Sequence, residues 1–454
     1  MNQSDTIAAI ATARGRAALA VVRLSGPDAV AIAAECFRGK ELTVADSHTA
    51  HVGYFIGGDG VEIDQVVVTV FRSPRSVTGE DVVEVSCHGG DFASQLILRR
   101  LLESGARMAD PGEFTQRAFI NGKMDLAQAE AVADLIHSSS SLAHRVSVAH
   151  LQGRYSEVLN ELRSELLDLC AFVELELDFS EEDVEFADRG RLDRLLVRSE
   201  GLLDELLSSY RLGSTLRDGV RVVIGGRPNA GKSTLLNAVV GRDRAIVSET
   251  PGTTRDEIEA EAEIEGVLFR FVDTAGLRET SDFIEAEGVR RARESIDRSD
   301  VLVYVFDVSM GLDEDEQDFL RRVNFLPVIL VANKRDLLNG RFPEPGEAIA
   351  LSARRGFKEA VELEPLIRRL IETAAADLGS ADASAVVTNQ RHRQHLRAAL
   401  NAVQSARRAL DSGASGDSLA LDLRQALHEL GSITGEITNE DVLDQIFSRF
   451  CIGK

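Results

Sequence analysis

The chain of 454 residues contains no tryptophan, only four tyrosines and only four cysteines. It has no apolar run near the roughly 18 residues that a membrane helix requires, so we expect no membrane span. The cysteines lie far apart without CxxC spacing, which argues against a disulfide scaffold or a zinc ribbon. Charged residues occupy the N-terminus where an export signal has its apolar stretch, so we expect a cytoplasmic protein.

Positive charge is also scarce, because 74 acidic residues outnumber 51 basic ones and the net charge is −23. A polybasic coat for nucleic acid is therefore excluded, although a local basic patch on an acidic protein can still bind nucleic acid. The composition, with 44% hydrophobic and 28% charged residues, is typical of a globular protein. At roughly 150 residues per domain, the length predicts about three domains.

The first half of the chain changes from a mixed to a helical pattern near residue 121. Residues 1–120 contain predicted strands over 66–71 and 81–88 and a predicted helix over 91–104. Residues 121–218 are predicted to be helical. Within them, apolar residues at steps of three or four predict one continuous helix face, made of Leu151, Tyr155, Val158, Leu162, Leu166, Leu169 and Val173.

The second half contains an α/β segment followed by helices. Residues 219–376 alternate strands with helices, a pattern typical of a mostly parallel sheet. The expected strands span residues 220–224, 268–272, 301–306 and 328–331. Residues 377–454 return to helix after a predicted linker over 374–385. We therefore predict a multidomain protein of α/β and α+β class, in which the α/β domain is inserted into one helical domain or separates two of them.

A phosphate-binding loop follows the first strand of the α/β segment. Residues Gly226 to Ser233 read GRPNAGKS and fit the pattern G-x-x-x-x-G-K-[ST]. Backbone amides of such a loop cradle phosphates at the positive end of the next helix. Lys232 is expected to reach the β- and γ-phosphates, and Ser233 is expected to bind Mg²⁺.

Three further motifs follow in the order of a GTPase. Residues 273–276 (DTAG) end a strand 41 residues after Lys232, residues 333–336 (NKRD) end another, and Ser352-Ala353 follow a further apolar segment. The carboxylate of Asp336 can accept two N–H groups of guanine that adenine lacks, so the site selects GTP. This set resembles the translation-factor-like GTPases. The predicted GTP-binding residues are Asn229, Ala230, Gly231, Lys232, Ser233, Thr234, Ser248, Glu249, Thr250, Pro251, Gly252, Thr253, Asp273, Thr274, Ala275, Gly276, Asn333, Lys334, Asp336, Ser352 and Ala353.

Two details indicate a special mode of hydrolysis. Leu277 follows DTAG where Ras-like enzymes have a water-orienting glutamine, so another group must orient the water. Asn229 inside the phosphate loop resembles the signature of potassium-activated GTPases, in which K⁺ neutralises charge developing between the phosphates. That resemblance implies Thr254 as a second Mg²⁺ ligand. It implies K⁺ ligands at Asn229, Ser248, Thr250 and Thr253.

The flanking segments carry the most specific motifs. They are TGED at 78–81, PGEFTQRAF at 111–119, NGKMDLAQAE at 121–130 and FCIGK at 450–454. Together they closely resemble the MnmE/TrmE family of tRNA modification GTPases over essentially the whole chain. The resemblance implies that residues 1–120 form a folate-binding and dimerisation domain, 121–218 and 377–454 one helical domain, and 219–376 an inserted GTPase domain.

The same resemblance implies a pathway. With an FAD-dependent MnmG/GidA-type partner, the chain is expected to add an aminomethyl or carboxymethylaminomethyl group to C5 of the wobble uridine, U34, of certain tRNAs. A tetrahydrofolate derivative of the 5,10-methylene or 5-formyl type supplies the one-carbon unit. The expected assembly is a homodimer that forms a heterotetramer with its partner. GTP is the substrate, with Mg²⁺ and K⁺ as cofactors.

Individual residues receive roles from this resemblance. Glu285 matches the position that orients the attacking water, and Lys232 is the other catalytic residue of the GTPase site. Cys451 is a candidate nucleophile or one-carbon handler, because a nearby lysine can favour its thiolate. The implied folate contacts are Arg23, Glu80, Lys123 and Lys454.

The mode of tRNA contact is less specific in the sequence. No aromatic RNA-recognition motif is present, so we expect the partner to hold much of the tRNA. Arg391, Arg393 and Arg397 are a candidate patch, or an ordinary polar helix face. The alternative function is a GTP-gated ribosome-assembly factor, because such GTPases share the nucleotide motifs; a KH domain or a second GTPase domain would favour it, and the sequence contains neither.

Overall fold

The computed structural model describes most of the chain. The described residues are 5–13, 15–178, 189–241, 259–273, 295–323, 325–338, 347–356, 359–374, 385–414, 416–448 and 450–453. They form two compact units, one made of residues 1–133 and 430–454 and the other of residues 134–429. In the described part of the chain, no helix has both the length and the apolarity that crossing a membrane requires.

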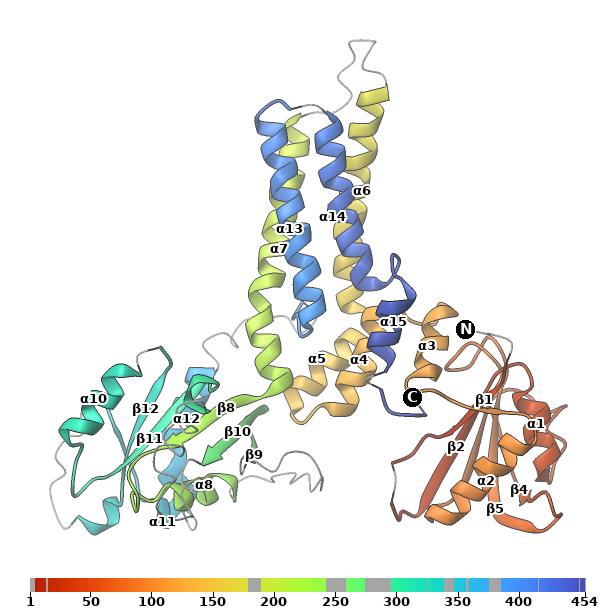
Figure 1. Ribbon diagram of the computed structural model, residues 1–454, viewed down its shortest axis with the longest axis horizontal. Coiled ribbons are helices and arrows are strands. Elements are labelled where there is room, and N and C mark those ends of the chain that lie inside the picture. The colour runs from red at the N-terminus through yellow and green to blue at the C-terminus, as the bar shows by residue number, and fades with distance from the viewer. Residues whose placement is uncertain are drawn as a thin grey trace, which may run out of the picture. The chain divides into compact units, whose positions relative to one another are not determined.

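The first unit is built on a sheet of seven strands within the described residues, in the order β3-β4-β5-β6-β2-β1-β7 (Figure 1). All neighbouring strands are antiparallel except β1 and β7, which are parallel. The strands are β1 (Ile7–Ile10), β2 (Leu19–Ser25), β3 (Phe37–Arg38), β4 (Thr49–Ile56), β5 (Glu62–Phe71), β6 (Val82–His88) and β7 (Arg107–Met108).

Helices cover the two faces of this sheet unequally. Along β5, Val66, Val68 and Val70 are buried while the residues between them are more exposed, as the two-residue period of a strand dictates. Helices α1 (Ala29–Cys36) and α2 (Asp91–Glu103) pack on the buried face. On the other face, Phe114 of α3 (Glu113–Ile120) packs against β1. The rest of unit 1 is helical, with α4 (Leu126–His137) and α15 (Glu440–Phe447).

The second unit contains long helices and a second sheet. The helices are α5 (Ser141–Leu151), α6 (Arg154–Asp178), α7 (Arg189–Asp218), α13 (Gln390–Asp411) and α14 (Gly416–Thr434), which continues into the first unit. α13, from near the C-terminus, packs along α7 (Figure 1). Both helices are amphipathic, and burial of their leucine faces joins segments that are far apart in the sequence.

The sheet of unit 2 has the order β13-β12-β11-β8-β10-β9 in the described residues, and only β9 runs antiparallel to its neighbour. Its strands are β8 (Val220–Gly225), β9 (Glu259–Ile264), β10 (Val267–Asp273), β11 (Val301–Asp307), β12 (Val328–Asn333) and β13 (Ile349–Ala350). Its helices are α8 (Lys232–Val240), α10 (Glu314–Arg322), α11 (Ala353–Gly356) and α12 (Glu364–Ala374), with short 3₁₀ turns at Arg335–Leu337 and Ala360–Leu363.

The mixed α/β and α+β class predicted from the sequence is confirmed, and so are the predicted strands and the helix after β6. One local prediction is wrong. The helix face expected to run without a break from Leu151 to Val173 is divided, because α5 ends at Leu151 and α6 begins at Arg154. Gly153 lies between them at a φ of 84°, a conformation that interrupts a helix. The predicted linker over 374–385 lies almost wholly outside the described residues.

Candidate functional site

The loop between β8 and α8 carries the predicted phosphate-binding residues. Gly226 leaves β8 at a φ of 133°, and a Cβ there would lie 2.0 Å from the carbonyl oxygen of Val305, so the turn requires glycine. Lys232 begins α8, and its Nζ donates to the carbonyl oxygens of Gly226 (3.0 Å) and Arg227 (2.9 Å). The lysine therefore lies across the loop, beside the positive end of α8 that favours a phosphate.

The other loop residues are arranged around this turn. Asn229 has a φ of 63° and an exposed side chain, whereas Ala230 is buried. Gly231 is the N-cap of α8 at a φ of 97°. Ser233 and Thr234 lie exposed in the first turn of α8, where hydroxyl groups can reach a bound metal or phosphate.

Asn333 joins the phosphate loop to the predicted guanine site. It ends β12 and is almost fully buried. Its Nδ2 donates to the carbonyl oxygen of Ala230 at 2.8 Å, and its Oδ1 accepts from the backbone N–H of Ala353 at 2.9 Å. One side chain thus holds together two loops that the sequence analysis could only place in order.

The residues predicted to recognise the base contact one another after the carboxyl end of β12. The hydroxyl of Ser352 donates to Oδ1 of Asp336 at 2.5 Å. The backbone N–H of Ser352 donates to Oε1 of Glu362 at 2.9 Å. Glu362 lies ten residues beyond Ser352 and belongs to none of the motifs, so the sequence offered no sign of this contact. These contacts fix the carboxylate that is predicted to accept the guanine N–H groups.

Asp307 contacts the predicted GTP-binding residue Lys334, and the sequence analysis did not identify it. The Nζ of Lys334 lies 2.8 Å from Oδ2 of Asp307, and the hydroxyl of Ser309 donates to Oδ1 at 2.7 Å. Burial acts to raise the pKa of Asp307, but the hydrogen bonds from Lys334 and Ser309 hold it below its usual value. A signal was present, because Asp307 ends β11 as Asn333 ends β12, and ligands bind at the carboxyl ends of parallel strands.

Arg227 anchors the phosphate loop to α10. Its guanidinium forms an ion pair with Asp313, the N-cap of that helix, and its Nε lies 3.3 Å from Oε1 of Glu316. Glu316 is buried and also accepts the hydroxyl of Tyr304 at 2.9 Å. Arg227 is therefore held by two contacts: its carbonyl oxygen accepts from Lys232, and its side chain pairs with α10.

Asp273 occupies the last position of β10, opposite Ile224 of the neighbouring parallel strand β8. Its backbone therefore lies at the same end of the sheet as the phosphate loop. The structure describes this backbone but not the side chain. The other predicted residues of the GTPase site lie outside the described residues, as does the C-terminal lysine: Ser248, Glu249, Thr250, Pro251, Gly252, Thr253, Thr254, Thr274, Ala275, Gly276, Glu285 and Lys454.

The predicted folate residues of unit 1 lie near α3. Arg23 is paired with Glu84 (2.9 Å from Nε to Oε1), and its guanidinium carbon lies 5.7 Å from the centre of the Phe114 ring. Glu80 follows the buried Thr78, and Lys123 donates to the carbonyl oxygen of Pro74 at 2.9 Å. Arg23 and Ser25 share one face of β2, and the hydroxyl of Ser25 donates to Oε2 of Glu80 at 2.6 Å.

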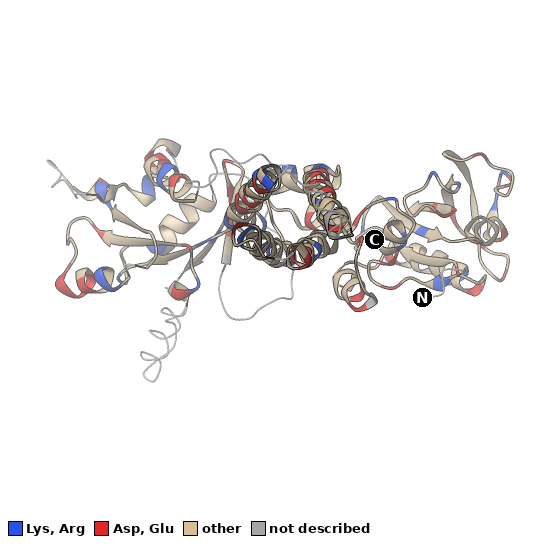
Figure 2. Ribbon diagram, turned by 90° about the horizontal axis from the view of Figure 1, so that it is seen from above, with Lys and Arg blue, Asp and Glu red and all other residues tan. Residues whose placement is uncertain are grey.

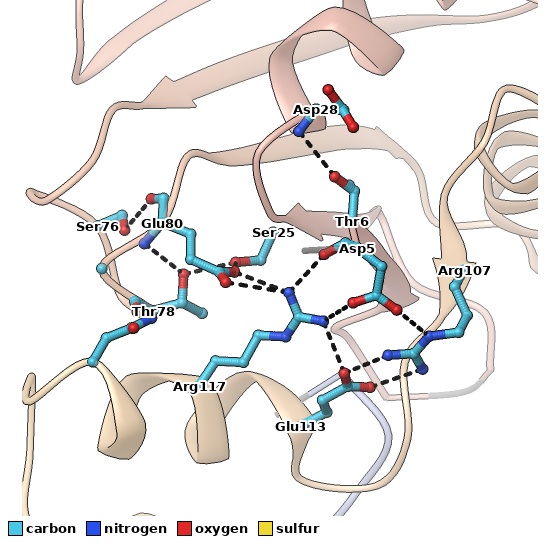
Figure 3. A network of polar contacts seen from close by, with 12 residues as sticks. Asp5, Thr6, Ser25, Asp28, Ser76, Thr78, Glu80, Arg107, Glu113 and Arg117 are labelled. Carbon is cyan, nitrogen blue, oxygen red and sulfur yellow. Dashed lines mark hydrogen bonds and ion pairs between the residues drawn. The ribbon is translucent and has the colours of Figure 1, made fainter. Parts of the chain in front are cut away.

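A network of charged side chains extends from Glu80 through Arg117 to Asp5, Glu113 and Arg107 (Figure 3). Arg117 of α3 donates to Glu80, Asp5 and Glu113, and Arg107 donates to Asp5 and Glu113. Burial acts to raise the pKa values of Asp5 and Glu113, but hydrogen bonds from both arginines hold them below their usual values. The sequence analysis assigned no role to Arg117, although it lies within the PGEFTQRAF motif.

The C-terminal tail docks on the turn before α3. Ile452 forms an antiparallel bridge with Pro111, and the N–H of Gly112 donates to the carbonyl oxygen of Cys451 at 3.5 Å. The Cys451 side chain is exposed. A Cβ on Gly112 would lie 2.7 Å from the carbonyl oxygen of Phe447, so this close approach depends on glycine. The tail therefore lies against the helix that carries Arg117.

Two arginines of the candidate basic patch on α13 contact aromatic rings of the same unit. The guanidinium carbon of Arg393 lies 4.5 Å from the centre of the Tyr210 ring, and Arg391 contacts His392. Figure 2 shows both acidic and basic positions along the ribbons of the long helices. These contacts do not test whether Arg391, Arg393 and Arg397 bind nucleic acid, so that role stays a prediction.

Comparison with known proteins gives matches along the whole chain. A family model described as "GTP-binding protein TrmE N-terminus" matches residues 6–123, and one described as "MnmE helical domain" matches residues 126–451. The tRNA modification GTPase MnmE of Salinibacter ruber is 65% identical over 465 residues, covering 100% of both chains. That of Cytophaga hutchinsonii is 46% identical over 462 residues, covering 100% of this chain and 98% of the relative. The chain therefore belongs to the MnmE family of tRNA modification GTPases.

Proposed function

We propose that this GTPase is stimulated by K⁺ and that its cycle drives modification of the wobble uridine of tRNA. The proposal that the chain binds GTP rests on the two hydrogen bonds of Asn333, one donated to the carbonyl oxygen of Ala230 and one accepted from the N–H of Ala353. They link the loop predicted to bind phosphate to the loop predicted to recognise guanine, which supports a single nucleotide contacting both. In this proposal Asp336 accepts the guanine N–H groups and Lys232 moves from its carbonyl partners to the β- and γ-phosphates.

Mg²⁺ and K⁺ fit the oxygen-donor groups of the loops. Ser233, with Thr254 of the first switch, is the proposed pair of Mg²⁺ ligands. Asn229 supports a K⁺ site, because its amide is exposed at the rim of the loop. Ser248, Thr250 and Thr253 would complete it. K⁺ at this position would supply positive charge between the phosphates as the bond breaks.

Glu285 is the proposed residue that orients the attacking water, a role that Leu277 cannot fill. Hydrolysis should be faster in KCl than in NaCl at equal ionic strength, and Asn229→Ala should abolish this difference. Equal rates of the wild-type chain in the two salts would refute the K⁺ proposal but leave GTP hydrolysis itself intact.

The N-terminal domain is the proposed folate site. A tetrahydrofolate bound there would supply the one-carbon unit that an FAD-dependent MnmG/GidA-type partner uses. Arg23 and Lys123, with Lys454, can pair with the glutamate tail, and Glu80 can accept pterin N–H groups. Cys451 supports this assignment, because its tail lies against the start of α3. We propose it as the nucleophile or one-carbon handler, so Cys451→Ser should abolish tRNA modification but spare GTP hydrolysis.

The proposed organisation follows the same assignments. Residues 1–120 form the folate-binding and dimerisation domain, 219–376 the inserted GTPase domain, and 121–218 with 377–454 the helical domain. The active assembly is a homodimer joined by its partner subunits in the cytoplasm. When two GTPase domains meet across the dimer, closure of the switches would transmit the nucleotide state to the folate site.

The decisive experiment is mass-spectrometric analysis of tRNA nucleosides from source cells with and without the gene. Loss of 5-carboxymethylaminomethyl- and aminomethyl-type uridines, restored by the wild-type gene but not by Asp273→Ala, would support the pathway and its need for GTP. An unchanged nucleoside profile would contradict it. The ribosome-assembly alternative would then be tested by sedimentation of ribosomal particles.

A further inference from the structure

Arg117 is the most highly connected side chain of the network in Figure 3, and its side chain is only 8% exposed. One terminal nitrogen donates to both carboxylate oxygens of Glu80, at 3.2 Å each, and to the backbone carbonyl of Asp5 at 2.9 Å. The other donates to Oδ1 of Asp5 at 2.7 Å and to Oε1 of Glu113 at 3.0 Å. A buried guanidinium with so many partners has one orientation.

Glu80 depends on this guanidinium for its own orientation. It lies in the turn before β6, together with the fully buried Thr78, which shares a hydrogen bond of 2.7 Å with the fully buried Ser25 at the end of β2. Oε2 of Glu80 accepts from Ser25 (2.6 Å) and Arg117, whereas Oε1 accepts from Arg117. An ionised carboxylate has about four acceptor positions. In the described part of the chain, the contacts to Glu80 leave one position, on Oε1.

We propose that Arg117 is a positioning residue, which orients Glu80 so that Oε1 accepts an N–H of a pterin ring. The inference rests on the proposed function, because it assumes that Glu80 contacts folate. Arg117 itself touches no ligand in this proposal. It acts by holding the carboxylate, and the acids on its other side hold Arg117.

The network offers a matched control. Arg107 binds the same two acids as Arg117, through Oδ2 of Asp5 at 2.7 Å and through Glu113 at 2.6 and 3.1 Å. Glu80 is not among its partners in the structure. Removing Arg107 therefore removes the same kind of support from Asp5 and Glu113 while the contact between Arg117 and Glu80 remains.

The test is calorimetric titration of the full-length protein with 5-formyltetrahydrofolate, with thermal unfolding measured in parallel. We expect Glu80→Gln and Arg117→Met each to weaken binding at least tenfold, and the double variant to be no weaker than the weaker single variant. Arg117→Lys should recover part of the affinity, because one charged donor remains. Arg107→Met should bind within about twofold of wild type, although it also lowers the melting temperature.

The outcomes separate the two levels of the proposal. If wild type does not bind 5-formyltetrahydrofolate, the proposed folate site is wrong and the role of Arg117 is wrong with it. If wild type binds but Arg117→Met binds as well as Arg107→Met does, only the positioning role is wrong. Additive losses for Glu80→Gln and Arg117→Met would also overturn that role, because they would mean that the two residues act independently.

Discussion

Replacing Asn333 by alanine is the sharpest perturbation of the nucleotide site that the structure suggests. The substitution removes the donor to the Ala230 carbonyl and the acceptor for the Ala353 N–H, at a position that is only 3% exposed. Ala230 and Ala353 are themselves only 3% and 1% exposed, so both backbone groups lose their partner in buried surroundings. In the variant, a bound nucleotide must therefore draw these loops together without the side chain that joins them.

The size of the effect follows from the number of groups left without a partner. Each buried backbone group that loses its hydrogen bond costs about 1–3 kcal/mol, so two cost about 2–6 kcal/mol. If the variant loses about 2 kcal/mol of binding free energy, the lower of these values, its affinity for the nucleotide falls about 30-fold, since each 1.4 kcal/mol is a factor of ten. GDP and GTP should lose affinity to a similar extent, because Asn333 joins the loops and does not sense the γ-phosphate.

The assay is displacement of a fluorescent GDP analogue from full-length protein, with circular dichroism to show that the fold persists. Asn333→Asp keeps the acceptor for Ala353 but places a carboxylate beside the Ala230 carbonyl, so we expect it to bind no better than Asn333→Ala. Asn237→Ala, on the exposed side of α8, is the control. Binding by Asn333→Ala within twofold of wild type would refute the reasoning.

Three other perturbations test separate parts of the molecule. Gly226→Ala should abolish GDP binding in the same assay while circular dichroism stays unchanged, because its Cβ would lie 2.0 Å from the Val305 carbonyl oxygen; binding at wild-type strength would contradict this. Arg227→Ala leaves the buried Glu316 without its cation and should lower the free energy of unfolding in urea by about 1–3 kcal/mol, whereas adding Glu316→Gln should restore part of it. Burial acts to raise the pKa of Glu113, but hydrogen bonds from two arginines hold that pKa below its usual value. The ionised Glu113 therefore stabilises the fold fully at any pH above its pKa in the unfolded chain. This stabilisation is lost as the pH falls through its lower pKa in the folded protein. The melting temperature should therefore fall in acid below the usual glutamate range, and Glu113→Gln should show a shallower fall; identical profiles would refute this assignment.

The α/β sheet could be predicted closely from the sequence for a physical reason. Strands of a parallel sheet are buried on both faces and appear as continuous apolar runs, such as Val301–Asp307 and Val328–Asn333. Strands β3 and β7 of unit 1 have two residues each, so no period can be read from them. Their positions are set by pairing with distant segments, as when Arg107 aligns with Ile7.

In the candidate sites, too, residues that are local in sequence could be predicted, whereas contacts made by folding could not. The predicted phosphate-binding loop is local in sequence, so a spacing pattern was enough to predict roles for Lys232 and Ser233. Glu362 could not be found from spacing, because its contact with Ser352 is created by the turn that precedes α12. Arg117 was visible within a motif, but its partner Asp5 lies more than a hundred residues away, and only the folded sheet shows what the arginine binds.

The C-terminal tail shows why motifs far apart in the sequence should be read together. Gly112 lacks a Cβ at the point where the Phe447 carbonyl approaches, so this glycine lets the tail reach α3. The turn that receives Cys451 and Ile452 leads directly into the helix that carries Arg117, and Arg117 orients Glu80. The tail therefore contacts the start of α3, and α3 in turn carries the arginine that binds the proposed pterin acceptor, Glu80. The motif PGEFTQRAF and the tail residues Cys451 and Ile452 accordingly belong to one structural unit, and its close packing depends on Gly112.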